Sequence, residues 1–223
     1  MTEKIVHHQG PVTLIGGGEI TQADLKEALL RAPVLVAADG GADRALALGA
    51  EPSAVIGDFD SLSAAARAVL DPSILHLVAE QETTDFDKAL RAIAAPLVLA
   101  VGFLGKRLDH QLAAFNVLVQ PHGGRCILIG AHELVVHLTR PLYLPLEPGA
   151  VVSLFPLTEV SGRSEGLEWP IDGLHLSPMG RVGTSNRATG PVRIDVDGPG
   201  LLAMLPRSAL DDLIPAMQAD PSR

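Results

Sequence analysis

The chain has 223 residues, of which 47% are hydrophobic and 19% are charged, and its formal net charge is −9. This composition is typical of a folded globular protein and excludes a disordered one. An acidic chain without a basic run repels nucleic-acid phosphates, so we expect no nucleic-acid partner. The single Cys126 excludes an intrachain disulfide. No apolar run reaches the length of a membrane-spanning helix, so a soluble, cytoplasmic protein is expected.

The first half of the chain alternates short apolar runs with helical patterns, as in a β-α-β fold. The runs predicted as strands are residues 12–15, 34–38, 54–56, 74–78, 97–101 and 126–129. They are apolar throughout, as expected of strands that are buried on both faces of a parallel sheet. Helices are predicted between them at residues 24–31, 85–94 and 108–119. We therefore predict an open, mostly parallel, Rossmann-like α/β sheet.

Two of these helices carry local signals. Thr84 is a good N-cap for the helix at residues 85–94. In the helix at residues 108–119, the helical period places four apolar side chains on one face: Leu108, Leu112, Phe115 and Val119.

The pattern changes after about residue 138. Residues 139–150 carry three prolines and are expected to form a linker or domain edge. Short strands are predicted beyond it at residues 151–155, 174–176, 192–196 and 201–205, followed by a helix at 208–218. We predict a smaller all-β sandwich there. The expected domains are therefore an α/β domain at residues 1–138 and a β-sandwich at residues 139–223.

Each of four successive predicted strands is followed by charged or polar residues, and the first of these strands is also followed by two glycines. In an open parallel sheet, ligands bind at the carboxyl ends of the strands, so these residues are expected to share one edge. Strand by strand they are Asp39 with Gly40 and Gly41, Asp58 with Asp60, Gln81 with Thr84 and Asp85, and Arg107 with Asp109.

Several carboxylates at one edge repel one another, and a divalent cation relieves the repulsion. Mg²⁺ prefers oxygen ligands and is commonly held by one or two carboxylates together with substrate phosphates. Asp58 and Asp60 lie two residues apart on a turn, so both are expected to face one ion while Phe59 points into the core. Asp85 opens a helix, where the helix dipole stabilises an anion.

Partners for phosphate are expected at the same edge. Gly40 and Gly41 let the backbone approach a ligand closely, Lys88 supplies a point charge, and Arg107 is suited to bidentate contact. Taken singly, each acidic residue is equally compatible with a helix cap or a solvated loop. Their joint occurrence at four strand ends favours a site. The glycines at residues 16–18 are compatible with either a phosphate nest or a plain tight turn.

These motifs, in this order, resemble the thiamine pyrophosphokinase family. The matching stretches are Asp39-Gly40-Gly41-Ala42, Gly57-Asp58-Phe59-Asp60-Ser61, Thr84-Asp85-Phe86-Asp87-Lys88-Ala89-Leu90 and Arg107-Leu108-Asp109-His110. In the second half, Gly166-Leu167-Glu168-Trp169-Pro170-Ile171 and Thr184-Ser185-Asn186 are similar to further family segments. One departure is Lys106, which stands where the family usually has glycine.

The resemblance implies an ATP- and Mg²⁺-dependent homodimer with thiamine bound between subunits. It implies Mg²⁺ ligands at Asp58, Asp60 and Asp85. ATP and its phosphates would be bound by Asp39, Gly40, Gly41, Gln81, Thr84, Lys88 and Arg107. Thiamine would be bound by Trp169, Ser185, Asn186 and Asp109. Catalysis would involve Asp58, Asp60, Asp85, Arg107 and Asp109.

The implied reaction is transfer of the pyrophosphoryl group of ATP to the thiamine hydroxyl, giving thiamine diphosphate and AMP. Asp109 and Asp85 are the candidates to accept the hydroxyl proton. Three alternatives remain open from the residues alone: a pyrophosphokinase for another alcohol such as a hydroxymethyl pterin, a metal-dependent phosphohydrolase, and a non-catalytic nucleotide- or thiamine-sensing module. The intact set of carboxylates makes the last of these the least favoured.

Overall fold

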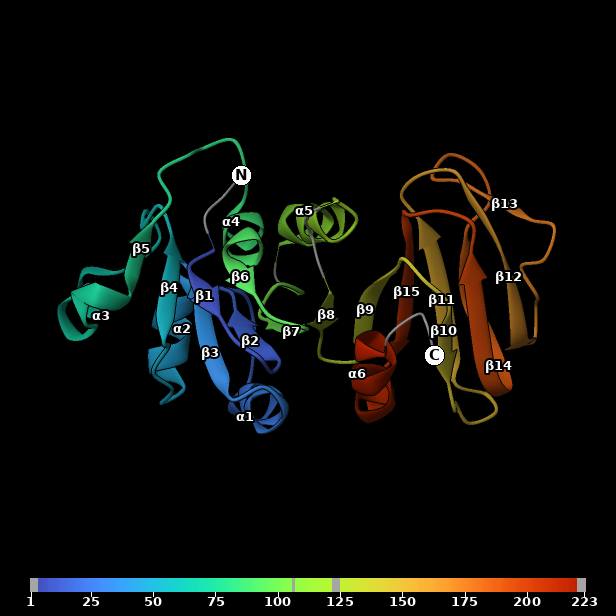
Figure 1. The fold of residues 1–223 in the computed structure, drawn as a ribbon, viewed down its shortest axis with the longest axis horizontal. Helices are drawn as coiled ribbons and strands as arrows, with labels where there is room; N and C mark the ends of the chain where they lie inside the picture. Colours follow the sequence, from blue (N-terminus) through green and yellow to red (C-terminus); the bar gives the residue numbers. More distant parts are fainter. Residues whose placement is uncertain (1–3, 106, 122–124, 220–223) are drawn as a thin grey trace. The chain divides into compact units, whose positions relative to one another are not determined.

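The computed structural model describes residues 4–105, 107–121 and 125–219, so Lys106 lies outside the described residues. The chain divides into two compact units, Met1–Ala131 and His132–Arg223, and each is described by itself (Figure 1). The predicted boundary between residues 138 and 139 stays a prediction. Among the described residues, the helices are too short or too polar to cross a membrane.

The first unit is built on a sheet of six strands in the order β8-β7-β2-β3-β4-β5, and each neighbouring pair is parallel (Figure 1). The strands are β2 Val12–Ile15, β3 Val34–Ala38, β4 Ala54–Gly57, β5 Leu75–Leu77, β7 Val98–Val101 and β8 Cys126–Ile129. Four of them, β2, β4, β7 and β8, are buried along their whole length, which is why their sequences do not alternate. A separate short parallel pair joins β1 Val6–His7 to β6 Ile93–Ala94.

Helices connect these strands: α1 Gln22–Arg31, α2 Gly41–Ala47, α3 Ala64–Val69, η1 Pro72–Ile74, α4 Asp85–Ala92 and α5 Leu108–Leu118. The hydroxyl of Thr84 accepts a hydrogen bond from the backbone N–H of Asp87, so the predicted N-cap of α4 is confirmed. Helix α4 packs against β3 and β4, and α5 packs against α4. The mixed α/β fold expected from the sequence is therefore confirmed.

The predicted apolar face of α5 is not the face that it buries. Leu108 is 69% exposed and Leu112 is 58% exposed, whereas the buried residues of the helix are Ala114, Val117 and Leu118. Both sets recur at helical spacing, so the periodicity alone does not distinguish them. The prediction chose the face with Leu108 and Leu112 because their side chains are large, and that choice was wrong.

The second unit is an antiparallel β structure closed by one helix. Its elements are β9 Glu133–Leu138, β10 Leu142–Leu144, β11 Val151–Pro156, β12 Val160–Leu167, β13 His175–Leu176, β14 Gly183–Val196, β15 Leu201–Pro206, η2 Arg207–Ala209 and α6 Leu210–Gln218. The long strand β14 pairs with β11 near its beginning and with β12 and β10 further along. Strand β15 lies between β11 and β9.

The sequence did not predict β9, β10, β12 or the first part of β14. Strand β10 lies within the predicted linker. Strand β12 buries Val160, Gly162, Ser164 and Leu167 and turns most of the residues between them outward. Such a strand contains no apolar run, so the signal used for the other strands is absent.

Candidate active site

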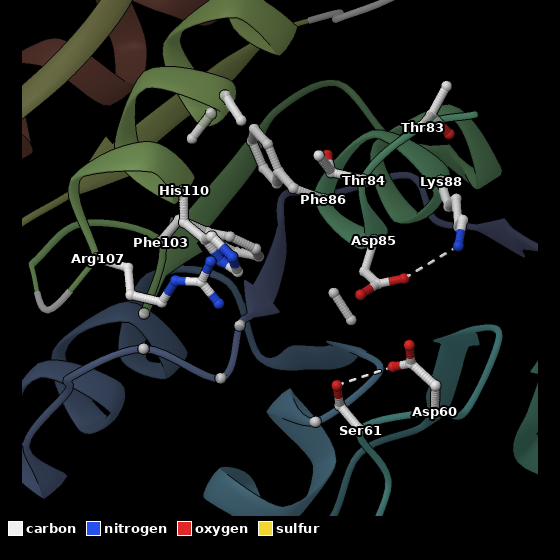
Figure 2. A pocket seen from close by; sticks show the side chains of 18 of the residues that line it. Asp60, Ser61, Thr83, Thr84, Asp85, Phe86, Lys88, Phe103, Arg107 and His110 are labelled. Atoms are coloured by element: carbon white, nitrogen blue, oxygen red, sulfur yellow. Dashed lines mark hydrogen bonds and ion pairs between the residues drawn. The ribbon is translucent and has the colours of Figure 1, made fainter. Parts of the chain in front are cut away.

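A cavity of about 540 Å³ lies at the carboxyl ends of the strands of the first unit (Figure 2). The residues of the predicted site that line it are Gly40, Asp58, Asp60, Gln81, Thr84, Asp85, Lys88 and Arg107. Figure 2 shows Asp60 and Asp85 facing the cavity from two sides, with Arg107 and His110 entering from a third. The structure thus brings the ends of four strands together at one edge, as the parallel topology requires.

Close backbone contacts shape the floor of this cavity. A Cβ atom at Gly41 would lie 2.2 Å from the carbonyl oxygen of Ile15, and one at Gly18 would lie 2.5 Å from that of Gly102. The N–H of Gly18 donates to the same Gly102 carbonyl at 2.9 Å. The glycines at residues 16–18 therefore form a bend that packs closely against the backbone of Gly102, and they also line the cavity.

Three carboxylates gather beside β3 and β4. Ligand oxygens of Asp39, Asp58 and Asp60 all lie within 4.8 Å of one another. Asp39 is only 1% exposed, and its Oδ2 accepts a hydrogen bond from the backbone N–H of Ser61 at 3.3 Å. Its Oδ1 is buried without a hydrogen-bond partner among the described residues. An orphaned carboxylate oxygen beside two further carboxylates fits a hard divalent cation.

The electrostatics of Asp39 agree with this. The pKa of Asp39 is raised to about 7, chiefly by burial; the negative charges of Asp85 and Asp58 add to this rise, and the hydrogen bond from Ser61 opposes it. A carboxyl group in this position holds its proton near neutral pH unless positive charge is supplied.

Lys88 is the buried counter-charge of the site. It is 1% exposed, and its Nζ lies 2.6 Å from Oδ2 of Asp58 and 3.3 Å from Oδ1 of Asp85. Gln81 donates to the same Asp58 oxygen at 2.9 Å. Burial by itself would lower the pKa of Lys88, but its bonds to the two carboxylates raise that pKa overall, so the lysine stays charged.

The two carboxylates that share Lys88 titrate differently. The hydrogen bond from Lys88 lowers the pKa of Asp58. Burial raises the pKa of Asp85, and its bond to Lys88 offsets the increase only in part. The sequence grouped Asp85 with Asp58 and Asp60, whereas the close three-carboxylate group in the structure contains Asp39 instead. Asp85 lies across the cavity and reaches Asp58 through the shared lysine.

The turn between Asp58 and Asp60 differs from the prediction. Phe59 has a positive φ of 66° and is only partly buried, so it does not point into the core. The guanidinium carbon of Arg67 lies 5.4 Å from the centre of its ring. The left-handed turn aims the ring toward the surface, where it packs against a cation.

Arg107 and Asp109 form an exposed pair at the beginning of α5. Nε of Arg107 lies 3.1 Å from Oδ1 of Asp109. The hydrogen bonds that Arg107 donates lower the pKa of Asp109. Arg107 lines the cavity, but three other predicted residues, Asp39, Gly41 and Asp109, do not. The predicted set also omitted cavity-lining residues, notably Ser61, Phe86, Phe103 and His110. Three of these lie inside or beside the strand-end motifs, so proximity to those motifs was the available signal.

The other predicted binding residues lie in the second unit. Trp169 follows β12 and is 56% exposed. Ser185 is exposed and has a positive φ of 63°. Asn186, in contrast, is buried, and its side chain is bonded to the backbone of Trp169.

Comparisons with known proteins were made for the sequence and for the fold. Models of the thiamin pyrophosphokinase catalytic domain and of the thiamin pyrophosphokinase vitamin B1 binding domain match residues 25–128 and 138–201. Thiamine pyrophosphokinase 1 of Oryza sativa subsp. japonica is 27% identical over 195 residues, which cover 70% of this chain and 72% of that protein.

Solved structures show the same fold. The chain matches yeast thiamin pyrophosphokinase with a TM-score of 0.75, at 16% identity and over 95% of each chain. It matches the thiamine pyrophosphokinase of Bacillus subtilis with a TM-score of 0.70, at 20% identity, over 88% of this chain and 98% of that one. The two domain models together span most of the sequence, so the predicted resemblance is confirmed and the chain belongs to the thiamin pyrophosphokinase family.

Proposed function

We propose that the cavity of the first unit transfers the pyrophosphoryl group of ATP to the hydroxyl of thiamine, giving thiamine diphosphate and AMP. The observation that carries this proposal is the gathering of Asp58, Asp60, Asp85 and Lys88 around one cavity at the strand ends, with the buried Asp39 beside Asp58 and Asp60. Carboxylates, a buried lysine and a bound divalent cation such as Mg²⁺ suit phosphate transfer. This chemistry depends mainly on positioning the reactants and stabilising the charge of the transition state. Membership of the family favours thiamine over a pterin alcohol or water as the acceptor.

Mg²⁺ is the cation we propose for this site. Asp58, Asp60 and Asp85 are its ligands as the sequence predicts, and Asp39 joins Asp58 and Asp60 in the close group. When bound, the ion neutralises charge on the phosphate oxygens.

The remaining groups of the site bind and orient the reactants. Arg107 is suited to a bidentate contact with phosphate, and Lys88 places a single positive charge beside Asp58. Gly40, Gln81 and Thr84 line the same cavity and complete the proposed nucleotide site with Asp39 and Gly41.

A carboxylate must accept or orient the proton of the attacking hydroxyl. A general base works best when its pKa is near the working pH. Burial raises the pKa of Asp85, whereas Arg107 lowers that of Asp109. Of the two candidates, Asp85 is therefore the better base.

The predicted thiamine residues of the second unit are Trp169 and Ser185, which are exposed, and Asn186, which is buried and bonded to the backbone of Trp169. Asp109 of the first unit is the fourth residue of this predicted set. A cationic ring over an exposed indole gains about 0.5–2 kcal/mol from cation–π attraction, and the thiazolium of thiamine is such a cation. We also propose a cytoplasmic homodimer with thiamine bound at the subunit interface, a Rossmann-like first domain and a β-sandwich second domain.

The activity is tested by measuring AMP release from ATP and Mg²⁺ with and without thiamine, while the organic product is identified by its mass. We expect AMP and thiamine diphosphate to appear together and only when thiamine is present. Phosphate release that does not need thiamine would indicate a hydrolase. Turnover with a hydroxymethyl pterin alone would indicate another alcohol.

The metal assignment is tested with Asp60→Asn. We expect this change to lower the rate by about 10²-fold or more, the value of a few kcal/mol in the transition state. Asp212→Asn is the matched control, because Asp212 is an exposed residue of α6 in the other unit. Near-normal turnover of Asp60→Asn with Mg²⁺ would show that the assignment is wrong.

A further inference from the structure

The side chain of Asn186 makes three hydrogen bonds to the backbone beside it. Its Oδ1 accepts hydrogen bonds from the N–H groups of Trp169 at 3.1 Å and Arg187 at 2.9 Å. Its Nδ2 donates to the carbonyl oxygen of Trp169 at 2.7 Å. Both acceptor positions and one of the two donor positions of the amide are therefore used. Because Asn186 is only 4% exposed, little of it is left for a ligand to touch.

We propose that Asn186 is a positioning residue, which holds the backbone of Trp169 so that the indole is presented to the ligand. Ser185 and Asn186 are adjacent on β14, next to a register shift in its pairing with β11, and Ser185 has a φ of 63°. Ser185 is exposed, while Asn186 lies on the buried face with Ala188. The two residues of the motif thus have different roles: Ser185 is available to a ligand at the surface, and Asn186 supports the backbone beneath it.

Trp169 needs such support because its own ring is more than half exposed and is held by little packing. The backbone around it is fixed instead. Glu168 N–H donates to the carbonyl of Arg187 at 2.8 Å, and Ile171 N–H donates to the hydroxyl of Ser164 at 3.0 Å. Asn186 restrains the backbone between Glu168 and Ile171 through its two hydrogen bonds to the backbone of Trp169.

The residue after Trp169 adds to this restraint. Pro170 disfavours the helical region for the residue before it and so confines the backbone of Trp169 to extended conformations. A platform whose backbone is ordered before binding loses less entropy when the ligand arrives. This inference rests on the proposed function for the identity of the ligand, thiamine, but not for the restraint on Trp169.

The chain contains a single tryptophan, so its fluorescence reports on Trp169 alone. In the full chain without ligand, Asn186→Ala should raise the acrylamide quenching constant about twofold and lower the emission anisotropy, because two hydrogen bonds that restrain the backbone are lost. Asn186→Asp retains the acceptor but loses the donor to the Trp169 carbonyl, and it should have a smaller effect in the same direction. Thr158→Ala is the matched control, since it also removes side-chain bonds to backbone carbonyls of the second unit.

Kinetics separate positioning from general damage. We expect Asn186→Ala to raise KM for thiamine about tenfold, which corresponds to the loss of one or two net hydrogen bonds. The KM for ATP and kcat should stay within about twofold of the wild type. Unchanged anisotropy and quenching in folded Asn186→Ala and Asn186→Asp would overturn the proposal, as would a fall in kcat with KM for thiamine unchanged.

The two proposals fail in different ways. If thiamine does not change the wild-type emission, the assignment of thiamine to Trp169 is wrong, while the quenching data without ligand still decide the role of Asn186. If Asn186→Ala does not fold, the decision rests on Asn186→Asp, in which the side chain keeps its size and its acceptor.

Discussion

Replacing Asp39 by Asn should make the metal-free protein more stable at pH 8. The pKa of Asp39 rises from 3.8 to about 7 on folding. The folded state therefore holds a proton that the unfolded state releases between these values, and the free energy of unfolding falls as the pH rises through this range. About three units correspond to about 4 kcal/mol at 1.36 kcal/mol per unit, which is an upper value because water entry and relaxation reduce the penalty of a buried charge.

The Asn side chain is neutral at every pH and still accepts the hydrogen bond that Ser61 N–H donates to Asp39. We therefore expect the stability of Asp39→Asn relative to wild type to be greater at pH 8 than at pH 5 by at least about 1 kcal/mol, because most of the wild-type loss falls between these two pH values. Urea unfolding with EDTA, followed by circular dichroism at the two pH values, measures this difference. Tryptophan fluorescence is unsuitable, because Trp169 reports on the other unit.

Asp212→Asn supplies the control, since it makes the same chemical change on the exposed surface of α6. Adding Mg²⁺ at pH 8 should stabilise the wild type, because a ligand that binds only the folded state favours it by mass action. The gain should be smaller in Asp39→Asn. A difference between variant and wild type that is the same at pH 5 and pH 8 would refute the reasoning.

Two further predictions concern a buried charge and a close backbone contact at the same edge of the sheet. Lys88→Met leaves Asp58 and Asp85 without their buried cation, so the free energy of unfolding at pH 7 should fall by about 3–5 kcal/mol in urea titrations; an unchanged midpoint would contradict this. Gly41→Ala places a Cβ atom 2.2 Å from the Ile15 carbonyl and should lower stability by about 1–3 kcal/mol. Gly49→Ala is its control, because the added Cβ meets nothing within 4 Å and only the positive φ is unfavourable; equal losses in the two variants would show that the contact does not matter.

The sequence misses the short strands β1 and β6, and β6 falls inside the predicted helix at residues 85–94. It predicts the six strands of the main sheet of the first unit within a few residues, because strands buried on both faces are recognisable as apolar runs. The same signal fails for β12, where Ser164 and Gly162 take buried positions. It also fails on α5, where two stripes have the same period and only tertiary packing selects the one with Ala114.

The grouping of site residues at one edge is predictable from parallel topology, but their individual contacts are not. The approach of Asp39 to Asp58 and Asp60 depends on a backbone with φ of 41° at Asp39 itself, which no pattern of residue types reveals. The inward position of Asn186 depends in the same way on which face of β14 is covered. Sequence reasoning therefore finds the members of a site more readily than it finds the work that each one does.

The charge balance around Lys88 has a consequence for which form of the nucleotide the cavity admits. Asp58 and Asp85 share this buried lysine, and Asp39 and Asp60 lie close to Asp58, so the region is negative whenever the four carboxylates are ionised. Free ATP carries several negative charges of its own and is repelled there, and surrounding salt screens the repulsion only weakly inside a cavity. In the complex of ATP with Mg²⁺, the cation neutralises most of the phosphate charge that faces the carboxylates. If these side chains bind the cation as proposed, they also select against uncomplexed nucleotide, and an excess of ATP over Mg²⁺ should lower the rate.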